Sequence, residues 1–179
     1  MRHTSPGLRD RISATLRDVP DFPKPGIMFK DITPVLGNGT MLRDVIAAMS
    51  APWLANDITH VAGIESRGFI LGAPIALALG AGFIPIRKAG KLPWRTVAEE
   101  YALEYGTDRL EIHIDACSAP SRILLVDDVL ATGGTAGAAC ALIDRLSGEI
   151  VGCSFLLAIT SLGGSARLRG RRVETLIEV

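Results

Sequence analysis

Continuous apolar runs that alternate with helical patterns are the feature that most restricts the fold of this chain. RILLVDD at 122–128 has four apolar residues in a row before two aspartates, and IVGCSFLLAI at 150–159 is almost wholly apolar. A strand buried on both faces needs such a run. The segment between them, GGTAGAACALIDRL at 133–146, has a helical pattern. This alternation predicts an α/β protein with a mainly parallel central sheet and helices on both faces.

The remaining segments fit the same rhythm. We expect an opening helix over 5–19 and another helix that begins at Thr40. Four prolines within 20–34 exclude a helix there and predict an ordered extended loop. Further strands are predicted at 58–64, 82–87, 109–115 and 173–179, with a helix of small residues at 69–79. We expect a single domain over 1–179, with an N-terminal hood segment of about residues 1–36.

Composition bears on partners and location. Lys and Arg together number 19, as do Asp and Glu, so the chain lacks the basic excess of a nucleic-acid-binding protein. No uncharged apolar run reaches the length of a membrane span, and the N-terminus lacks the apolar core of a signal peptide. Cys117, Cys140 and Cys153 do not have the spacing of metal ligands. We expect a cytoplasmic protein with reduced cysteines, no nucleic-acid partner and no membrane partner.

Ligands of parallel sheets bind beyond the carboxyl ends of the strands, which directs attention to VDDVLATGGT at 126–135. Asp127 and Asp128 repel phosphate, but carboxylates accept hydrogen bonds from sugar hydroxyls or bind a divalent ion. The helix start that follows favours an anion, and Thr132 and Thr135 add hydroxyl donors. A few extended residues span about 10 Å, so a diol at one end and a monophosphate at the other fit. Ribose 5-phosphate has this form.

Common nucleotide-binding motifs fit this stretch less well. An ATPase strand would need a P-loop, and a dinucleotide site would need G-x-G-x-x-G after a predicted strand; the chain has neither pattern. A solvated turn with two surface aspartates is the remaining alternative. Charges that end a buried strand and meet a Gly-Gly helix start argue against that alternative.

The stretch resembles the phosphoribosyl-pyrophosphate (PRPP) signature of type I phosphoribosyltransferases. Five stretches resemble the adenine phosphoribosyltransferase family in order and spacing: DFPKPGIMFKDITPVL, AGIESRGFILG, IRKAGKLP, YALEYG and VDDVLATGGT. The resemblance implies the type I phosphoribosyltransferase fold and a purine-salvage reaction, in which adenine and PRPP give AMP and pyrophosphate. The ribose 5-phosphate contacts that we expect are Asp127, Asp128, Ala131, Thr132, Gly133, Gly134 and Thr135.

Pyrophosphate needs cations, and basic residues follow two predicted strands. A cation there stabilises the leaving group as the C1–O bond breaks, which makes Arg67 a candidate catalytic residue. Each of these cations alone would more often be a solvated surface charge. The expected pyrophosphate contacts are Ser66, Arg67, Arg87, Lys88 and Lys91. Lys91 differs from the others because it lies on a loop. We expect Mg²⁺ to arrive bound to PRPP and water, so no protein metal site is predicted.

Residues 88–106 are long, polar and poor in periodicity, as lids often are. A lid would exclude water from a transition state that resembles an oxocarbenium ion. The resemblance matches Glu104 to the family's acidic residue near the purine, where it would manage a proton of the adenine ring. Without the resemblance, an exposed glutamate near Glu99 and Glu100 would be the better interpretation.

Adenine needs a flat apolar slot with polar edges. Phe29 can pack on the ring, or serve as a core aromatic, while backbone groups of Met28 and Lys30 can meet the base edge. The resemblance makes Ile159 the opposite apolar wall. Hypoxanthine would leave groups unpaired, at a cost of roughly 1–3 kcal/mol each. Lys30 stands where the family often carries arginine, and the two differ if the side chain makes a bidentate contact.

Two alternatives remain open. The chain could use another purine base, or it could be a regulator that senses PRPP on the same fold. Such regulators normally have a nucleic-acid-binding domain or a basic face, and the charge balance favours neither. The resemblance also implies a homodimer.

Overall fold

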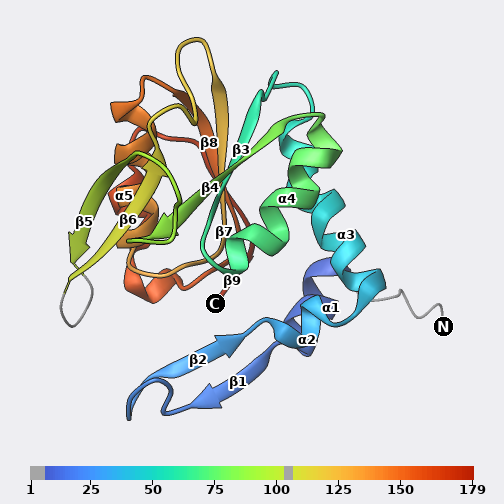
Figure 1. The fold of residues 1–179 in the computed structure, drawn as a ribbon. Coiled ribbons are helices and arrows are strands. Elements are labelled where there is room, and N and C mark those ends of the chain that lie inside the picture. The colour runs from blue at the N-terminus through green and yellow to red at the C-terminus, as the bar shows by residue number, and fades with distance from the viewer. Residues whose placement is uncertain (1–6, 103–106) are drawn as a thin grey trace. The chain divides into compact units, whose positions relative to one another are not determined.

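The computed structural model describes residues 7–102 and 107–179, and the side chain of Ala102 is not described. Two compact units make up the chain, Met1–Ala48 and Met49–Val179. The predicted hood of about residues 1–36 lies within the first unit. Figure 1 draws the elements of both units. No helix of the described residues is long and apolar enough to cross a membrane.

The first unit begins with α1 (Leu8–Thr15), which is shorter than the predicted helix over 5–19. Residues Arg17–Pro20 form strand β1 instead, paired antiparallel with β2 (Met28–Asp31). The helical prediction was wrong at 17–19 because strand pairing between distant residues, such as Val19 with Phe29, overrides the local apolar spacing. Residues 5 and 6 lie outside the described residues. Two helices follow β2: α2 (Thr33–Leu36) and α3 (Gly39–Ser50), the latter one residue before its predicted start.

The proline-rich segment 20–34 is only partly the extended loop that was predicted. Residues Met28–Asp31 form β2, and residues 21–27 connect β1 to β2. Thr33 and Pro34 begin α2, so the exclusion of a helix was wrong at 33–34, because proline is tolerated in the first turn of a helix. Asp21 (φ 58°) accepts a hydrogen bond from the backbone N–H of Gly26 at 2.7 Å, and Gly26 has φ 86°. This turn returns the chain so that β2 runs beside β1. Pro23 and Pro25 restrict the turn, and Pro20 is the last residue of β1, so none of these prolines lies in β2.

The second unit is built on a sheet whose order in the described residues is β5-β6-β4-β3-β7-β8-β9. Its parallel strands are β4 (Gly82–Lys88), β3 (His60–Ile64), β7 (Arg122–Leu130), β8 (Glu149–Ala158) and β9 (Val173–Glu178). Every strand expected from an apolar run is therefore present. Helices α4 (Arg67–Leu79) and α5 (Gly134–Arg145) cover opposite faces of the sheet (Figure 1). The predicted fold class is confirmed.

The edge beyond β4 is antiparallel. Strand β6 (Thr107–His113) pairs with both β4 and β5 (Thr96–Ala102). The segment 88–106 was predicted as a loop, but Thr96–Ala102 is a strand. Val97 and Tyr101 pack against the core, whereas the strand also carries Glu99 and Glu100, so its apolar alternation is weak in the sequence. Its role as a lid stays a prediction, and residues 103–106 lie outside the described residues.

Short turns connect the carboxyl ends of the parallel strands to the helices that follow. Two residues separate β3 from α4, and three separate β7 from α5. After β8, the 3-10 helices η2 (Thr160–Leu162) and η3 (Gly164–Leu168) lead along the chain to β9. The side chains at this edge of the sheet make up the candidate site.

Candidate active site

The loop 131–133 joins β7 to α5 and leads into the helix N-terminus. Strand β7 continues to Leu130, two residues past its predicted end, so Asp127 and Asp128 lie within the strand, near its carboxyl end. Gly133 has φ 78°, a left-handed conformation that glycine adopts without strain, and its carbonyl accepts the first helical bond from Gly137 at 2.9 Å. The first N–H groups of a helix have no intrahelical acceptor. They remain available to an anion at this loop.

The two aspartates of β7 have different surroundings. Asp128 is buried, and its carboxylate accepts a short hydrogen bond from Nε of Arg67, the first residue of α4. Asp127 Oδ1 accepts from the backbone N–H of Asp128 at 2.9 Å. Burial, and then the charge of Asp128, raise the pKa of Asp127 well above its usual value. The structure thus brings a predicted pyrophosphate residue, Arg67, directly onto a predicted ribose residue, Asp128.

Gly68 makes this approach of α4 to β7 possible. A Cβ atom at Gly68 would lie 2.8 Å from Asp127 Oδ1 and 3.0 Å from the carbonyl oxygen of Val126. The first distance is shorter than real Cβ contacts, and the second is shorter than most of them. The glycine after Arg67 therefore lets the start of α4 reach the end of β7, while Ser66 remains exposed beside it.

Glu65 joins the remaining predicted cations, although no role was predicted for it. Its Oε2 accepts from Nε of Arg87 at 3.1 Å and from the backbone N–H of Lys88 at 3.2 Å, and its Oε1 accepts a short hydrogen bond from Lys91 Nζ. Burial acts to raise the pKa of Glu65, but the hydrogen bonds from Lys91, Lys88 and Arg87 outweigh it and hold that pKa below its usual value. A carboxylate thus sits among the predicted pyrophosphate cations.

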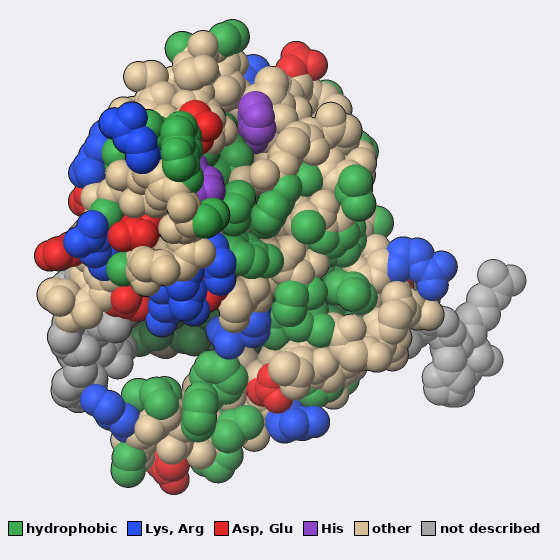
Figure 2. Space-filling view, in the orientation of Figure 1, with side chains coloured by type: hydrophobic (Ala, Val, Ile, Leu, Met, Phe, Trp, Pro, Cys, Tyr) green, Lys and Arg blue, Asp and Glu red, His purple; other side chains and the backbone are tan. Residues whose placement is uncertain are grey.

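The side chain of Lys88 forms an ion pair with a different carboxylate. Its Nζ lies 3.2 Å from Asp108 Oδ2, on β6. Figure 2 shows basic and acidic side chains mixed on the side of the second unit that carries β5 and β6. Glu65, Asp108 and Glu111 each form an ion pair with a basic residue. The cations are therefore locally neutralised by carboxylates that a bound pyrophosphate would have to replace.

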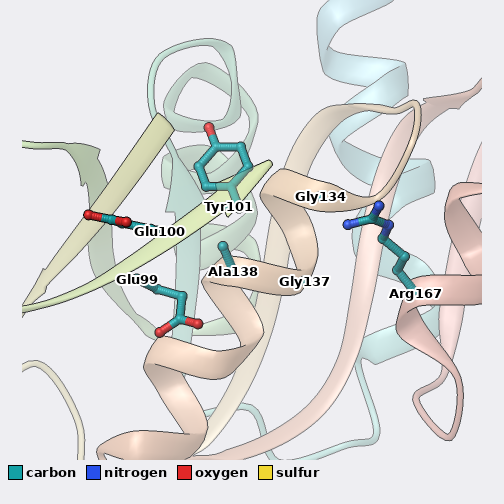
Figure 3. Close-up of a pocket in the computed structure, with 7 residues that line it drawn as sticks. All are labelled: Glu99, Glu100, Tyr101, Gly134, Gly137, Ala138 and Arg167. Carbon is teal, nitrogen blue, oxygen red and sulfur yellow. The ribbon is translucent and has the colours of Figure 1, made fainter. Parts of the chain in front are cut away.

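A cavity of about 520 Å³ lies beside the loop 131–133, which is the predicted phosphate loop, where β5 meets the first turns of α5 (Figure 3). Its lining residues are Glu99, Glu100, Tyr101, Gly134, Gly137, Ala138 and Arg167. The hydroxyl of Tyr101 donates a hydrogen bond to Oδ2 of Asp108 at 3.3 Å. Burial raises the pKa of Tyr101. Arg167 points from η3 toward the first turns of α5 in Figure 3.

The predicted adenine residues belong to both units, and each unit is described by itself. In the first, the ring of Phe29 packs edge-to-face on Phe22, with centroids 5.1 Å apart. Lys30 Nζ lies 2.7 Å from Oδ1 of Asp18, its partner across the β1–β2 pair, and Met28 is half exposed. In the second unit, Ile159 directly follows β8. Glu104 lies outside the described residues.

Comparisons with known proteins agree with this arrangement. A sequence model of the family described as phosphoribosyl transferase domain matches residues 37–169. An adenine phosphoribosyltransferase of Myxococcus xanthus (strain DK1622) is 60% identical over 166 residues, which are 93% of this chain and 90% of that protein. The chain belongs to the adenine phosphoribosyltransferase family.

Solved structures of adenine phosphoribosyltransferases have the same fold. The enzyme of Rhodothermus marinus DSM 4252 is 53% identical, with a TM-score of 0.92 over 96% of this chain and 98% of that one. The enzyme of Saccharomyces cerevisiae, crystallised with adenine and an imino-altritol bisphosphate, is 37% identical, with a TM-score of 0.89 over 94% and 98% of the two chains. The family fold therefore extends over nearly the whole length of this chain.

Sequence reasoning missed two residues of the candidate site. Glu65 directly follows β3, so its position at the carboxyl end of a parallel strand was a usable signal. Tyr101 lies on a strand that was predicted as loop, so its hydrogen bond to Asp108 and its place in the cavity lining could not be anticipated.

Proposed function

We propose that the chain transfers the phosphoribosyl group of PRPP to adenine, giving AMP and pyrophosphate in purine salvage. The observation that carries this proposal is the contact between Arg67 and Asp128, which places a cation of the predicted pyrophosphate loop against a carboxylate of the predicted ribose site. The family membership favours adenine over another purine base, and over a PRPP-sensing regulator.

Each part of PRPP meets a suitable group in this proposal. The ribose hydroxyls donate to the carboxylates of Asp127 and Asp128, and the 5-phosphate accepts from the N–H groups of 131–135 and from the hydroxyls of Thr132 and Thr135. A terminal monophosphate needs no lysine inside that loop, because the helix dipole and several donors act on it together.

The pyrophosphate is proposed to bind to Ser66, Arg67, Arg87, Lys88 and Lys91. Negative charge grows on it as the C1–O bond breaks, and fixed cations stabilise that charge more in the transition state than in the ground state. A ring nitrogen of adenine bonds to C1 as pyrophosphate leaves, and the ring gives up a proton. We propose Glu104 as the group that manages this proton, and Met28, Phe29, Lys30 and Ile159 as the adenine contacts.

We also propose that Mg²⁺ enters with PRPP. The described residues contain no cluster of three or more possible metal ligands. The donor set that is present, the paired carboxylates of β7, suits a cation held mainly by substrate oxygens and water. Bound to the substrate, Mg²⁺ would neutralise charge on the pyrophosphate. A homodimer and a cytoplasmic location complete the proposal; the free thiols of Cys117, Cys140 and Cys153 support a reducing compartment.

The reaction is tested by supplying the purified chain with PRPP, Mg²⁺ and adenine, and by measuring AMP and pyrophosphate together. We expect the two products in equal amounts, and no turnover with excess EDTA. Pyrophosphate without AMP would instead indicate hydrolysis. PRPP binding without turnover would favour the regulator.

A further inference from the structure

Gly164, the first residue of η3, lies in direct backbone contact with the phosphate loop. A Cβ atom at Gly164 would lie 2.2 Å from the carbonyl oxygen of Ala131 and 2.9 Å from the backbone nitrogen of Gly133. The contact is reciprocal, since a Cβ atom at Gly133 would lie 2.4 Å from the carbonyl oxygen of Gly164. No side chain therefore separates the two backbones.

The turn that carries Gly164 is itself held in place. At the end of η3, Leu168 is only 2% exposed and belongs to the main hydrophobic core. Within the turn, the N–H of Gly163 donates to Thr160 at 3.1 Å and the N–H of Ala166 donates to Gly163 at 3.0 Å. Gly164 is thus buried in a turn that is fixed by hydrogen bonds and by the core, and the loop packs against its backbone.

We propose that Gly164 is a positioning residue for the phosphate loop, and that its contact with Ala131 and Gly133 sets the affinity for the ribose 5-phosphate part of the substrate. This inference rests on the proposed function. Gly133 and Gly134 have no side chains that could pack and fix the loop, so a neighbouring backbone must do it. The direction of the loop's N–H groups decides how well they meet a phosphate, and a shift of about 1 Å is enough to weaken such a site greatly.

Gly164→Ala is a clean test because its backbone conformation suits alanine. The φ of Gly164 is outside the left-handed region, unlike the φ of 64° at Gly163 and of 78° at Gly133. The three atoms nearest to the added methyl group all belong to the loop. Gly39→Ala is the matched control: it makes the same chemical change in α3, where a Cβ atom would meet nothing within 4 Å.

The two variants and the unmodified chain are titrated with ribose 5-phosphate and, separately, with magnesium pyrophosphate. We expect Gly164→Ala to weaken ribose 5-phosphate binding by about tenfold to hundredfold, with pyrophosphate binding unchanged. Its KM for PRPP should rise more than its kcat falls, and Gly39→Ala should match the unmodified chain. Unchanged ribose 5-phosphate binding, or an equal loss of both ligands, would overturn the inference.

The unmodified chain provides a second measurement that holds even where Gly164→Ala fails to fold. Hydrogen exchange of residues 163–168 is followed with each ligand. Ribose 5-phosphate should slow exchange at Gly163 and Ala166, because fixing the loop fixes the turn, whereas pyrophosphate should not. Equal exchange with and without ribose 5-phosphate would contradict the proposed contact. Failure of the unmodified chain to bind ribose 5-phosphate or to form AMP would instead refute the proposed function.

Discussion

The carboxylate of Glu65 accepts a hydrogen bond from Nε of Arg87 at 3.1 Å, so the residue that directly follows β3 orients a cation at the end of β4. The same carboxylate binds Lys91. Glu65 therefore holds two predicted pyrophosphate cations close together, where their mutual repulsion would otherwise separate them. In this account the cations are arranged before the substrate arrives.

Glu65→Gln should raise the KM for PRPP by about tenfold or more, because hydrogen bonds to a charged group contribute about 1.5–3 kcal/mol and about 1.4 kcal/mol is a factor of ten. Steady-state kinetics at saturating adenine measure this. Glu149→Gln is the control, since it removes the charge from another carboxylate paired with an arginine, Arg122, at an exposed site. Equal KM values for the two variants would show that Glu65 does not organise the cations.

Asp127→Asn should stabilise the fold at neutral pH while weakening ribose binding. The pKa of Asp127 is raised in the folded chain, so folding favours its protonated form. This contribution to stability is present below the usual aspartate pKa and is lost as the pH rises through the raised value. Thermal midpoints across pH should show the variant above the unmodified chain at neutral pH, by about 2–4 °C for each kcal/mol. The difference between the two thermal midpoints should disappear at acid pH. A difference that stays constant with pH would contradict the raised pKa of Asp127.

Arg67→Lys should lower kcat/KM for PRPP by about tenfold to hundredfold, since lysine keeps the charge but not the planar donor set that reaches Asp128. Arg11→Lys is the control, because Arg11 pairs with Asp44 at 2.7 Å in the first unit. Initial rates of AMP formation compare the two. Similar rates for both variants would remove Arg67 from the catalytic set.

Lys30→Arg should change the KM for adenine by less than about threefold. Lys30 Nζ is paired with Asp18 across the hairpin, and arginine can make the same pair. Such a pair contributes only about 0–1 kcal/mol. Strand β2 has one strand neighbour in the described residues, β1, so part of its backbone is directed away from the pair and can meet a base edge. A large change in KM would instead indicate that the side chain of residue 30 recognises adenine.

The parallel sheet was predictable because strands such as β7 and β8 are buried on both faces and therefore read as continuous apolar runs. The turn between β7 and α5 was predictable because two aspartates at the end of an apolar run are followed by glycines that begin a helical pattern, and its role as a phosphate loop stays a prediction. Strand β5 was not predictable, because it is an edge strand whose surroundings tolerate Glu99 and Glu100. Strand β1 was hidden by an apolar spacing that also suits a helix.

The features of the candidate site that could not be predicted depend on contacts between distant segments of the chain. Glu65 meets Lys91, and Gly164 meets Ala131, across separations that no local pattern records. A glycine in a segment such as LGGSARL indicates only a turn. The short distance between Gly164 and the phosphate loop is what shows that a side chain is excluded there.

Competition among bases tests the central claim most directly. The purified chain is given PRPP, Mg²⁺ and equimolar adenine, hypoxanthine and guanine, and the nucleotides formed are identified. AMP as the only nucleotide is the predicted result. IMP or GMP in amounts comparable to AMP would contradict adenine recognition by residues 28–30, and the absence of any nucleotide would contradict the transferase itself.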